Sequence, residues 1–179
     1  MLVMELLKDG GRAAIVLPDG TLFGEGIKTR IKEKLLRDCN LHTIVRLPNG
    51  VFSPYTSIRT NILFFTKGKP TTEVWYYEHP YPPGAKSYNK TKPMRIEEFE
   101  PEKAWWKNRE QTEYAWKVSV AAIAANGYNL DIKNPNTVGA SHEDPLVLLV
   151  QYQEAATTAD QARLDLKAAL QSCLEQSMG

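Results

Sequence analysis

Two apolar runs separated by a helical stripe lie near the start of the chain, and this order limits the fold more than any other feature. Residues 12–17 carry a nearly continuous run, Ala-Ala-Ile-Val-Leu, that ends at a Pro-Asp-Gly turn. Such runs are typical of strands that are buried on both faces of a parallel sheet. Apolar residues recur at helical spacing in residues 27–36, and residues 42–47 form the next strand-like run. This order predicts a βαβ unit with two parallel strands and a right-handed crossover.

A third apolar run, residues 61–66, follows the second after an irregular loop without a helical pattern. Because a parallel return needs a crossover, usually a helix, we expect the third strand to run antiparallel to the second. A loop this long and irregular inside a compact domain is often functional. Residues 1–8 predict the end of a helix that stops at Gly10-Gly11.

The regular pattern weakens after the third strand. Residues 73–77 predict a half-polar strand, whereas residues 79–94 hold four prolines and predict an irregular surface segment. Short helical pieces are expected at residues 96–99 and 103–106. Residues 116–125 leave two alternatives open, because their valines favour a strand and their alanines favour a helix.

The last part of the chain predicts a long helix. Asp144 is a good N-cap and Pro145 a good first helical residue. One stripe of the helix is then apolar or small: Tyr152, Ala156, Ala159, Ala162, Leu166, Leu170 and Cys173. This spacing fits a coiled-coil seam with a partner, although a helix packed on its own domain gives a similar pattern.

The charge of the whole chain gives little information about partners. The net charge is +1 at pH 7, which neither supports nor excludes a nucleic-acid ligand. Any DNA contact would therefore need a local basic patch, and one candidate set lies on the first predicted helix: Lys28, Arg30, Lys32, Lys34 and Arg37. The segment also carries Glu25 and Glu33, so a solvated helix face explains the pattern as well.

The cysteines and histidines are scattered. Cys39 and Cys173 form no CxxC pair, and the three histidines (His42, His79 and His142) form no ligand cluster. The sequence therefore predicts no metal site. No apolar run reaches the roughly 18 residues that span a bilayer, and no secretory leader is recognisable. We expect a cytoplasmic protein without a membrane partner.

Known catalytic motifs give only weak matches. Gly24-Glu-Gly26 resembles half of a dinucleotide-binding fingerprint, but Thr29 occupies the third glycine position, which favours a simple entry into the helix. Tyr81-Pro-Pro-Gly84 lacks the amide side chain that would make a Pro-Pro motif useful for catalysis. The residues alone therefore assign no catalytic group to this chain.

Phe52 stands out within the long loop. An isolated phenylalanine is more often a core residue, but three features of the surrounding sequence favour a functional role. Phe52 follows a strand end and an Asn49-Gly50 turn, Pro54 and Tyr55 stiffen the loop behind it, and Thr60 leads back into an apolar strand.

Several segments in the same order resemble the modification subunit of type I restriction-modification systems, a family of adenine-N6 DNA methyltransferases. GGRAAIVLPDG (10–20) is similar to the fifth strand of its catalytic domain, and CNLHTIVRLPNGVF (39–52) to the sixth strand and the start of the base-binding loop. TNILFFTK (60–67) resembles the antiparallel strand that closes the sheet. The connecting region carries similar segments, VWYY (74–77) and ANGYNLD (125–131). The resemblance extends over essentially the whole chain.

The resemblance implies a reaction and a role for the loop. The reaction is methyl transfer from S-adenosylmethionine to N6 of adenine in double-stranded DNA, which requires the base to be flipped out of the helix. By position, Phe52 would stack on the flipped base. Pro54, Tyr55 and Arg59 would lie near the flipped nucleotide, with Arg59 as a phosphate contact.

Two motifs of that family have no counterpart here. The glycine-rich cofactor motif is absent, and so is the Asn/Asp-Pro-Pro-aromatic motif that polarises the adenine amino group; the only Asn-Pro pair, Asn134-Pro135, precedes Asn136. We therefore expect the C-terminal portion of such a subunit, inactive alone, with S-adenosylmethionine bound only in the complete enzyme. The expected fold is α/β, a partial Rossmann-like sheet followed by an irregular region and a long helix.

The expected division is the C-terminal half of the catalytic domain at 1–78, a connecting region at 79–143 and an assembly helix at 144–179. The resemblance implies that this helix contacts the specificity subunit and a second modification subunit. An exposed sheet edge would also favour a homodimer of the chain. The alternative function is a non-catalytic interaction module that binds the specificity subunit.

Overall fold

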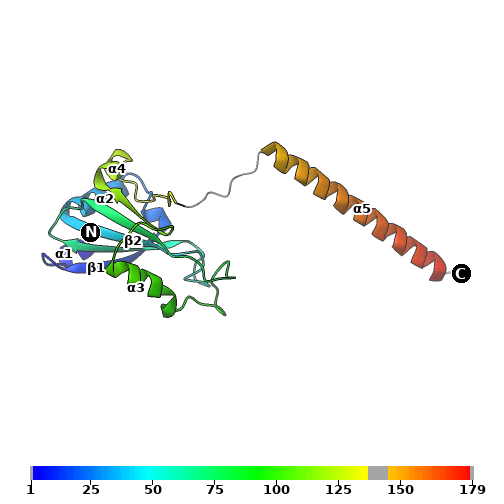
Figure 1. The fold of residues 1–179 in the computed structure, drawn as a ribbon, viewed down its shortest axis with the longest axis horizontal. Helices are drawn as coiled ribbons and strands as arrows, with labels where there is room; N and C mark the ends of the chain where they lie inside the picture. The colour runs from blue at the N-terminus through cyan, green and yellow to red at the C-terminus, as the bar shows by residue number, and fades with distance from the viewer. Residues whose placement is uncertain (1, 137–144, 178–179) are drawn as a thin grey trace. The chain divides into compact units, whose positions relative to one another are not determined.

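The computed structural model describes residues 2–136 and 145–177, which fall into two compact units divided between Thr137 and Val138 (Figure 1). The first unit is a five-stranded sheet with helices packed on it, and the second is one helix. In chain order the elements are α1 (Leu2–Leu6), β1 (Arg12–Pro18), η1 (Asp19–Thr21), α2 (Ile27–Asp38), β2 (Cys39–Arg46), β3 (Thr60–Lys67), β4 (Glu73–Glu78), η2 (Ile96–Phe99), α3 (Glu100–Lys107), β5 (Ala115–Ser119), α4 (Val120–Ala125) and α5 (Pro145–Ser177).

The strand order in the sheet is β1-β3-β2-β4-β5. β3 runs antiparallel to both β1 and β2, β2 and β4 are parallel, and β5 is antiparallel to β4. The prediction that β3 returns antiparallel to β2 is therefore confirmed. β1 and β2 run parallel to each other as predicted, but they do not pair directly, because β3 lies between them.

The central place of β3 follows from its side chains. Leu63 and Phe65 point into one core, while Ile62 and Phe64 pack against the cluster on the opposite face of the sheet. A strand that is apolar on both faces is most stable inside a sheet, where packed layers cover both faces and neighbouring strands pair with both edges. Strand–helix–strand order in the sequence does not reveal that a later strand will be inserted in this way.

β1 differs from its prediction in burial. Its residues alternate between exposed and half-buried, and Val16 is 47% exposed. The expectation of a strand buried on both faces is therefore wrong for this chain. β1 lies at the end of the strand order, and within the described residues one of its faces is covered only in part. Its continuous apolar sequence does not distinguish an edge strand from a central one.

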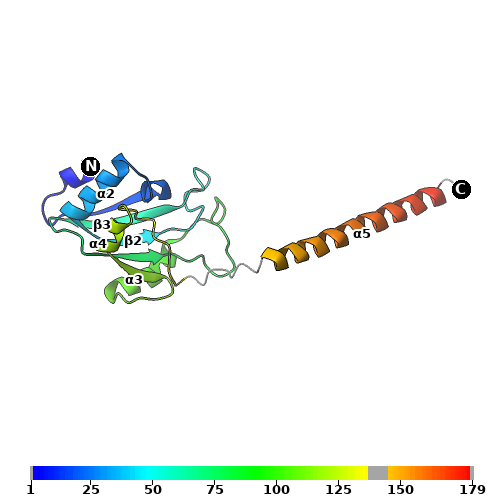
Figure 2. The same ribbon diagram turned by 90° about the horizontal axis from the view of Figure 1, so that it is seen from above.

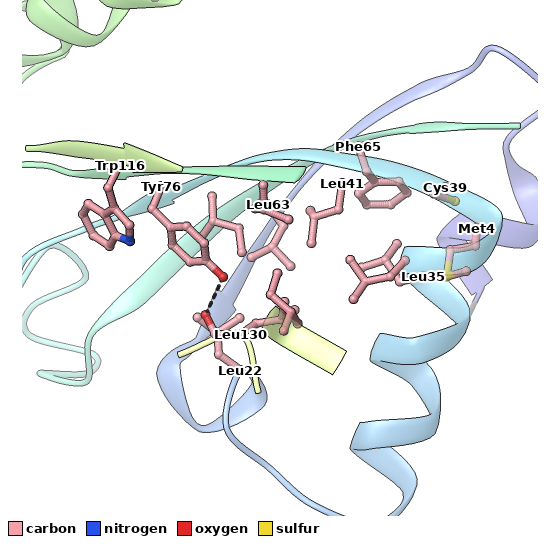
Figure 3. Packing of buried hydrophobic residues seen from close by; sticks show 14 residues of the cluster. Met4, Leu22, Leu35, Cys39, Leu41, Leu63, Phe65, Tyr76, Trp116 and Leu130 are labelled. Carbon is pink, nitrogen blue, oxygen red and sulfur yellow. Dashed lines mark hydrogen bonds between the residues drawn. The ribbon is translucent and has the colours of Figure 1, made fainter. Parts of the chain in front are cut away.

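Helices α2 and α3 lie on opposite sides of the sheet (Figure 2). The larger core lies between the sheet and the face that carries α2 and α4, and it includes Leu35, Leu41, Phe65 and Tyr76 (Figure 3). The smaller cluster lies under α3 around Trp105. These two layers of side chains fix the sheet from both sides.

The segment 116–125, which the sequence left open, is both a strand and a helix. β5 ends at Ser119, and the Ser119 hydroxyl accepts a hydrogen bond at 3.3 Å from the backbone N–H of Ala122, as an N-cap should. The short helices at 96–99 and 100–107 also agree with the prediction. Segments on both sides of the expected boundary at residue 78 share this sheet, since β5 pairs with β4.

The predicted long C-terminal helix is present as α5. Its side chains Tyr152, Leu164 and Leu166 are exposed. The predicted N-cap Asp144 lies outside the described residues. Within the part of the chain that the structure covers, no helix is long and apolar enough to cross a membrane.

Candidate functional site

The loop between β2 and β3 is closed at its base by backbone hydrogen bonds. The N–H of Leu47 donates to the carbonyl of Thr60 at 2.9 Å, and Leu47 itself is buried. The N–H of Asp19, just after β1, donates to the carbonyl of Arg59 at 3.0 Å. Both ends of the loop are thus fixed to the sheet, at the ends of β1 and β2.

The inner part of the loop is a hydrogen-bonded turn. Ser53 donates its N–H to the carbonyl of Gly50 at 3.0 Å, and the Ser53–Pro54 peptide is cis. The carbonyl of Phe52 accepts from the N–H groups of Tyr55 and Thr56, at 2.9 and 3.2 Å. These bonds hold the backbone of Phe52 in place.

Phe52 is not a core residue. It is 40% exposed, and the neighbouring Tyr55 and Ile58 are 93% and 59% exposed. Water-exposed aromatic side chains on a fixed turn cost solvation free energy, and they are more common where a ligand covers them. The loop therefore offers apolar and aromatic surface at the ends of two strands.

Arg59 lies in this loop but already has partners. Its Nε donates to Oδ1 of Asn49 at 3.2 Å, and Nη1 lies 3.8 Å from the Glu78 carboxylate. The side chain remains 43% exposed, so water screens the ion pair with Glu78. A phosphate near Arg59 would compete with a weak contact only.

The proline-rich segment after β4 supports the loop from outside. The Tyr81 hydroxyl donates to the carbonyl of Asn49 at 3.2 Å. Gly50 has φ +81°, and a Cβ at that position would lie 2.5 Å from the carbonyl oxygen of Tyr88. The rings of Tyr81 and Tyr88 are 5.5 Å apart. This support could not be predicted, because nothing in the order of residues indicates that the segment folds back on the loop.

Tyr88, the buried tyrosine of this proline-rich segment, is hydrogen-bonded to an acidic side chain. The Tyr88 hydroxyl donates to the Glu98 carboxylate, and Tyr88 is 5% exposed. Burial first, and then this hydrogen bond, raise the pKa of Tyr88 well above the usual tyrosine range. Tyr88 therefore stays protonated and keeps its role as a donor at every physiological pH.

A polar contact joins η1, directly after β1, to β3 near the base of the loop. Nδ2 of Asn61 donates to Oδ1 of Asp19 at 2.6 Å, and Asn61 is fully buried at the start of β3. This bond fixes the Asp19 side chain beside the base of the loop. Asp19 was not among the predicted site residues, although its place directly after a strand is a usable sequence signal.

The candidate basic patch on α2 is not one continuous solvent face. Lys32 is 5% exposed, and its Nζ donates to the carbonyls of Leu22 and Gly24 at 2.7 and 2.9 Å. Burial, and then the nearby Lys28, lower the pKa of Lys32. The interpretation of the set as a solvated face is thus wrong for Lys32, which fastens the loop before the helix.

The same loop explains the Gly24-Glu-Gly26 pattern. Gly26 is the N-cap of α2 with φ 66°, so the glycines serve the entry into the helix. Among the described residues, no group of three or more His, Cys, Asp and Glu side chains is placed to hold a metal ion.

Comparison with known proteins identifies the family. Residues 1–144 match the family model for N-6 DNA methylases. The chain belongs to the N-6 DNA methylase family. Over 185 aligned residues it is 56% identical to the methylase subunit of the type I restriction enzyme EcoEI from Escherichia coli. That alignment covers 99% of this chain and 38% of the relative, so the chain spans little more than a third of that relative's length.

Solved structures give the same result. A modification subunit from Vibrio vulnificus YJ016, assigned to a type I restriction enzyme, matches with a TM-score of 0.72 and 50% identity, over 76% of this chain and 31% of that one. A structure describing complex assembly and conformational transition of the type I R-M system matches with a TM-score of 0.70 and 34% identity, over 96% of this chain and 37% of that one. The chain thus corresponds to part of a type I methylase subunit.

Proposed function

We propose that this chain supplies the base-binding loop of a type I DNA methylase that transfers a methyl group to N6 of adenine. The observation that carries the proposal is Phe52, which is 40% exposed on a turn whose backbone is held by two hydrogen bonds. An adenine inside the duplex cannot reach a methyl donor, so it must be extruded and held outside. An exposed ring on a fixed turn suits that task.

The contribution of Phe52 can be estimated. Base stacking on an aromatic side chain contributes about 1–3 kcal/mol per base, or roughly 5- to 150-fold in binding. Pro54 and Tyr55 lie in the same turn and are exposed, so they are proposed to lie along the flipped nucleotide. Arg59 is proposed as a phosphate contact that would exchange its weak pair with Glu78 for the phosphate.

The residues of this chain do not fit a site for S-adenosylmethionine. Two lysine side chains already hydrogen-bond the backbone of the glycine-containing segment before α2. Lys32 donates to the carbonyl of Gly24, and Lys28 donates to the carbonyl of Gly20. In nucleoside-binding folds the acidic residue that binds the ribose hydroxyls follows the glycine turn by about 20 residues. Residues 40–50 of this chain contain no Asp or Glu. We therefore propose that other parts of the complete enzyme hold the methyl donor, and that this chain alone does not methylate DNA.

The loop is tested in a complete type I methylase that contains this sequence, assembled with its specificity subunit. Phe52→Ala is expected to reduce methylation by at least about tenfold, and Phe52→Tyr to retain most of it, because only the stacking ring is needed. Phe23→Ala is the matched control, since Phe23 is also half-exposed but lies after η1. A base analogue that fluoresces when unstacked, placed at the target adenine, reports flipping directly.

Unchanged methylation by the Phe52→Ala enzyme would contradict the proposal. The alternative function, a non-catalytic module that binds the specificity subunit, predicts that result together with unchanged subunit assembly. The exposed apolar side chains of α5, among them Tyr152 and Leu166, favour such an interaction in either case.

The role of α5 is tested separately. We propose that it packs against the specificity subunit or a second modification subunit, because a single helix cannot cover its own apolar side chains. The double variant Leu166→Glu/Leu170→Glu is expected to abolish co-purification with the specificity subunit. Gln161→Glu, which adds charge off the predicted stripe, is the control. Retained co-purification of the double variant, or its loss in the control, would contradict this role.

Two measurements on the 179-residue chain by itself address its activity and its oligomeric state. Calorimetric titration with S-adenosylmethionine is expected to show no binding, and stoichiometric binding would overturn the placement of the donor site. Analytical ultracentrifugation tests the proposed homodimer, for which the partly covered strand β1 is the candidate contact. A monomer at all concentrations would exclude that dimer.

A further inference from the structure

A cleft of about 550 Å³ lies on the β1–β3 pair, away from the loop. Arg12 and His42 line it from the sheet, and Trp106 and Arg109 from α3 and the residues after it. Arg12 pairs with Thr66 at one end of β1, whereas the loop begins beside the other end of that strand, where Pro18 pairs with Thr60. Six residues of strand correspond to about 20 Å, so this is a different place from the Phe52 turn.

Trp106 forms the aromatic wall of this cleft. Its ring meets that of Phe64 edge to face at 4.9 Å and that of His42 at 5.8 Å. The guanidinium carbon of Arg109 lies over the Trp106 ring at 4.4 Å from its centre. Stacking uses the flat face of a guanidinium and leaves its N–H groups free at the edge, where they match a phosphate or carboxylate.

The cleft is cationic and lacks a counterion. Neither Arg12 nor Arg109 has an ion pair with a carboxylate in the part of the chain that the structure describes, and no acidic side chain lines the cleft there. Arg109 is nevertheless partly buried, which lowers the pKa of its guanidinium through loss of solvation. Its contacts with the rings of Trp105 and Trp106 stabilise the cation in part, and a bound anion would neutralise the charge.

An adjoining apolar hollow adds a second requirement for the ligand. It has a volume of about 330 Å³, shares Phe64 and Trp106 with the cleft, and also includes Glu102. Glu102 is 4% exposed; its Oε1 contacts His79, but its Oε2 has no hydrogen-bond partner. The buried carboxylate oxygens of Glu102 do not reach the surface of the hollow, which is entirely apolar and suits the flat face of an aromatic base.

We propose that the cleft and hollow together bind a nucleoside phosphate. Arg12 and Arg109 hold the phosphate, and the base lies against Phe64 and Trp106 in the apolar hollow. The combined dimensions suit a ligand of mononucleotide size. Such a ligand is either a free nucleotide or one nucleotide of single-stranded DNA, and the chemistry recognised is the same in both.

The test is calorimetric titration of the 179-residue chain with deoxyadenosine monophosphate, deoxyadenosine, inorganic phosphate and a short oligo(dA). The monophosphate is expected to bind at least about tenfold more tightly than deoxyadenosine or phosphate alone, because it contacts both parts of the site. Tighter binding of oligo(dA) than of the monophosphate would identify single-stranded DNA as the source, and weaker binding a free nucleotide; both support the proposal.

Variants locate the binding. Arg109→Gln and Arg12→Gln are each expected to weaken monophosphate binding by about tenfold. Arg30→Gln, on the other side of the sheet, is the control for charge. Circular dichroism confirms that each variant is folded.

Two results would overturn the proposal. One is the absence of monophosphate binding even at millimolar concentration. The other is binding that the Arg12 and Arg109 variants leave unchanged. Because the proposal does not depend on the function of the loop, either result leaves the proposed role of Phe52 unaffected.

Discussion

The guanidinium of Arg46, at the end of β2, lies 2.8 Å from the Asp131 carboxylate in the segment after α4. The same side chain donates to the carbonyl of Ile132 at 2.9 Å, and the Tyr76 hydroxyl donates to that of Leu130 at 3.1 Å (Figure 3). These three polar contacts attach residues 130–132, which follow α4, to strands β2 and β4 of the sheet that carries the loop.

Replacing Arg46 by methionine is expected to destabilise the chain. The substitution leaves the Asp131 carboxylate and the Ile132 carbonyl without their partner, and breaking a buried pair of this kind costs about 3 kcal/mol. The midpoint of denaturant unfolding measures the loss. Lys103→Met removes one member of an exposed pair with Glu100 and is expected to cost no more than about 0.5 kcal/mol. Equal losses in the two variants would contradict the importance of burial here.

Gly50→Ala and Gly84→Ala form a matched pair. Both glycines have positive φ, +81° and +79°, so an alanine at either position costs about 1–2 kcal/mol of backbone strain. Only at Gly50 does the new Cβ also meet a backbone oxygen, that of Tyr88. We expect Gly50→Ala to lower the melting temperature clearly more than Gly84→Ala. Similar melting temperatures would show that the loop and the tyrosine segment can move apart freely.

Lys32→Met is expected to destabilise α2 and the turn before it. The variant keeps most of the buried volume but removes the donor for the carbonyls of Leu22 and Gly24, at a cost of about 1–2 kcal/mol. Arg30→Gln, on the exposed side of the same helix, should change stability by less than about 0.5 kcal/mol. Chemical denaturation of both variants measures the difference, and a tolerated Lys32→Met would refute the anchoring role.

His42 is expected to titrate below the ordinary histidine range in the folded chain. Burial is the main cause of its lowered pKa, and the cation Arg109 adds to it. Because the unfolded chain binds a proton more readily, stability is fully present above about pH 6.5 and falls as the pH drops from there toward the folded pKa. Imidazole proton shifts in NMR spectra measure the pKa directly.

Arg109→Gln separates the two causes of that shift. The variant removes the cation but leaves the burial, so the pKa of His42 should rise only part of the way to its ordinary value. A complete return to the ordinary value would show that charge, rather than burial, dominates. His42→Gln should remove this part of the pH dependence of unfolding.

The local structure of this chain could be predicted from its sequence because it depends on patterns within a few residues. Apolar runs bounded by turn residues predicted β1, β2, β3 and β4, and helical spacing of apolar residues predicted α2 and α5. The family followed from ordered segments, and the match to N-6 DNA methylases confirms it. The role of Phe52 stays a prediction, supported by its exposure on a fixed turn.

The arrangement of these elements depended on tertiary structure, because pairing and burial join residues far apart in the chain. The place of β3 between β1 and β2 depends on which strands pair with its two edges, and an apolar run alone does not identify these neighbours. The burial of Lys32 depends on its hydrogen bonds to the carbonyls of Leu22 and Gly24, which lie in the segment before the helix. The close approach of Gly50 to Tyr88 also arises only when distant segments pack together. The same is true of the cleft, which both Arg12 and Arg109 line.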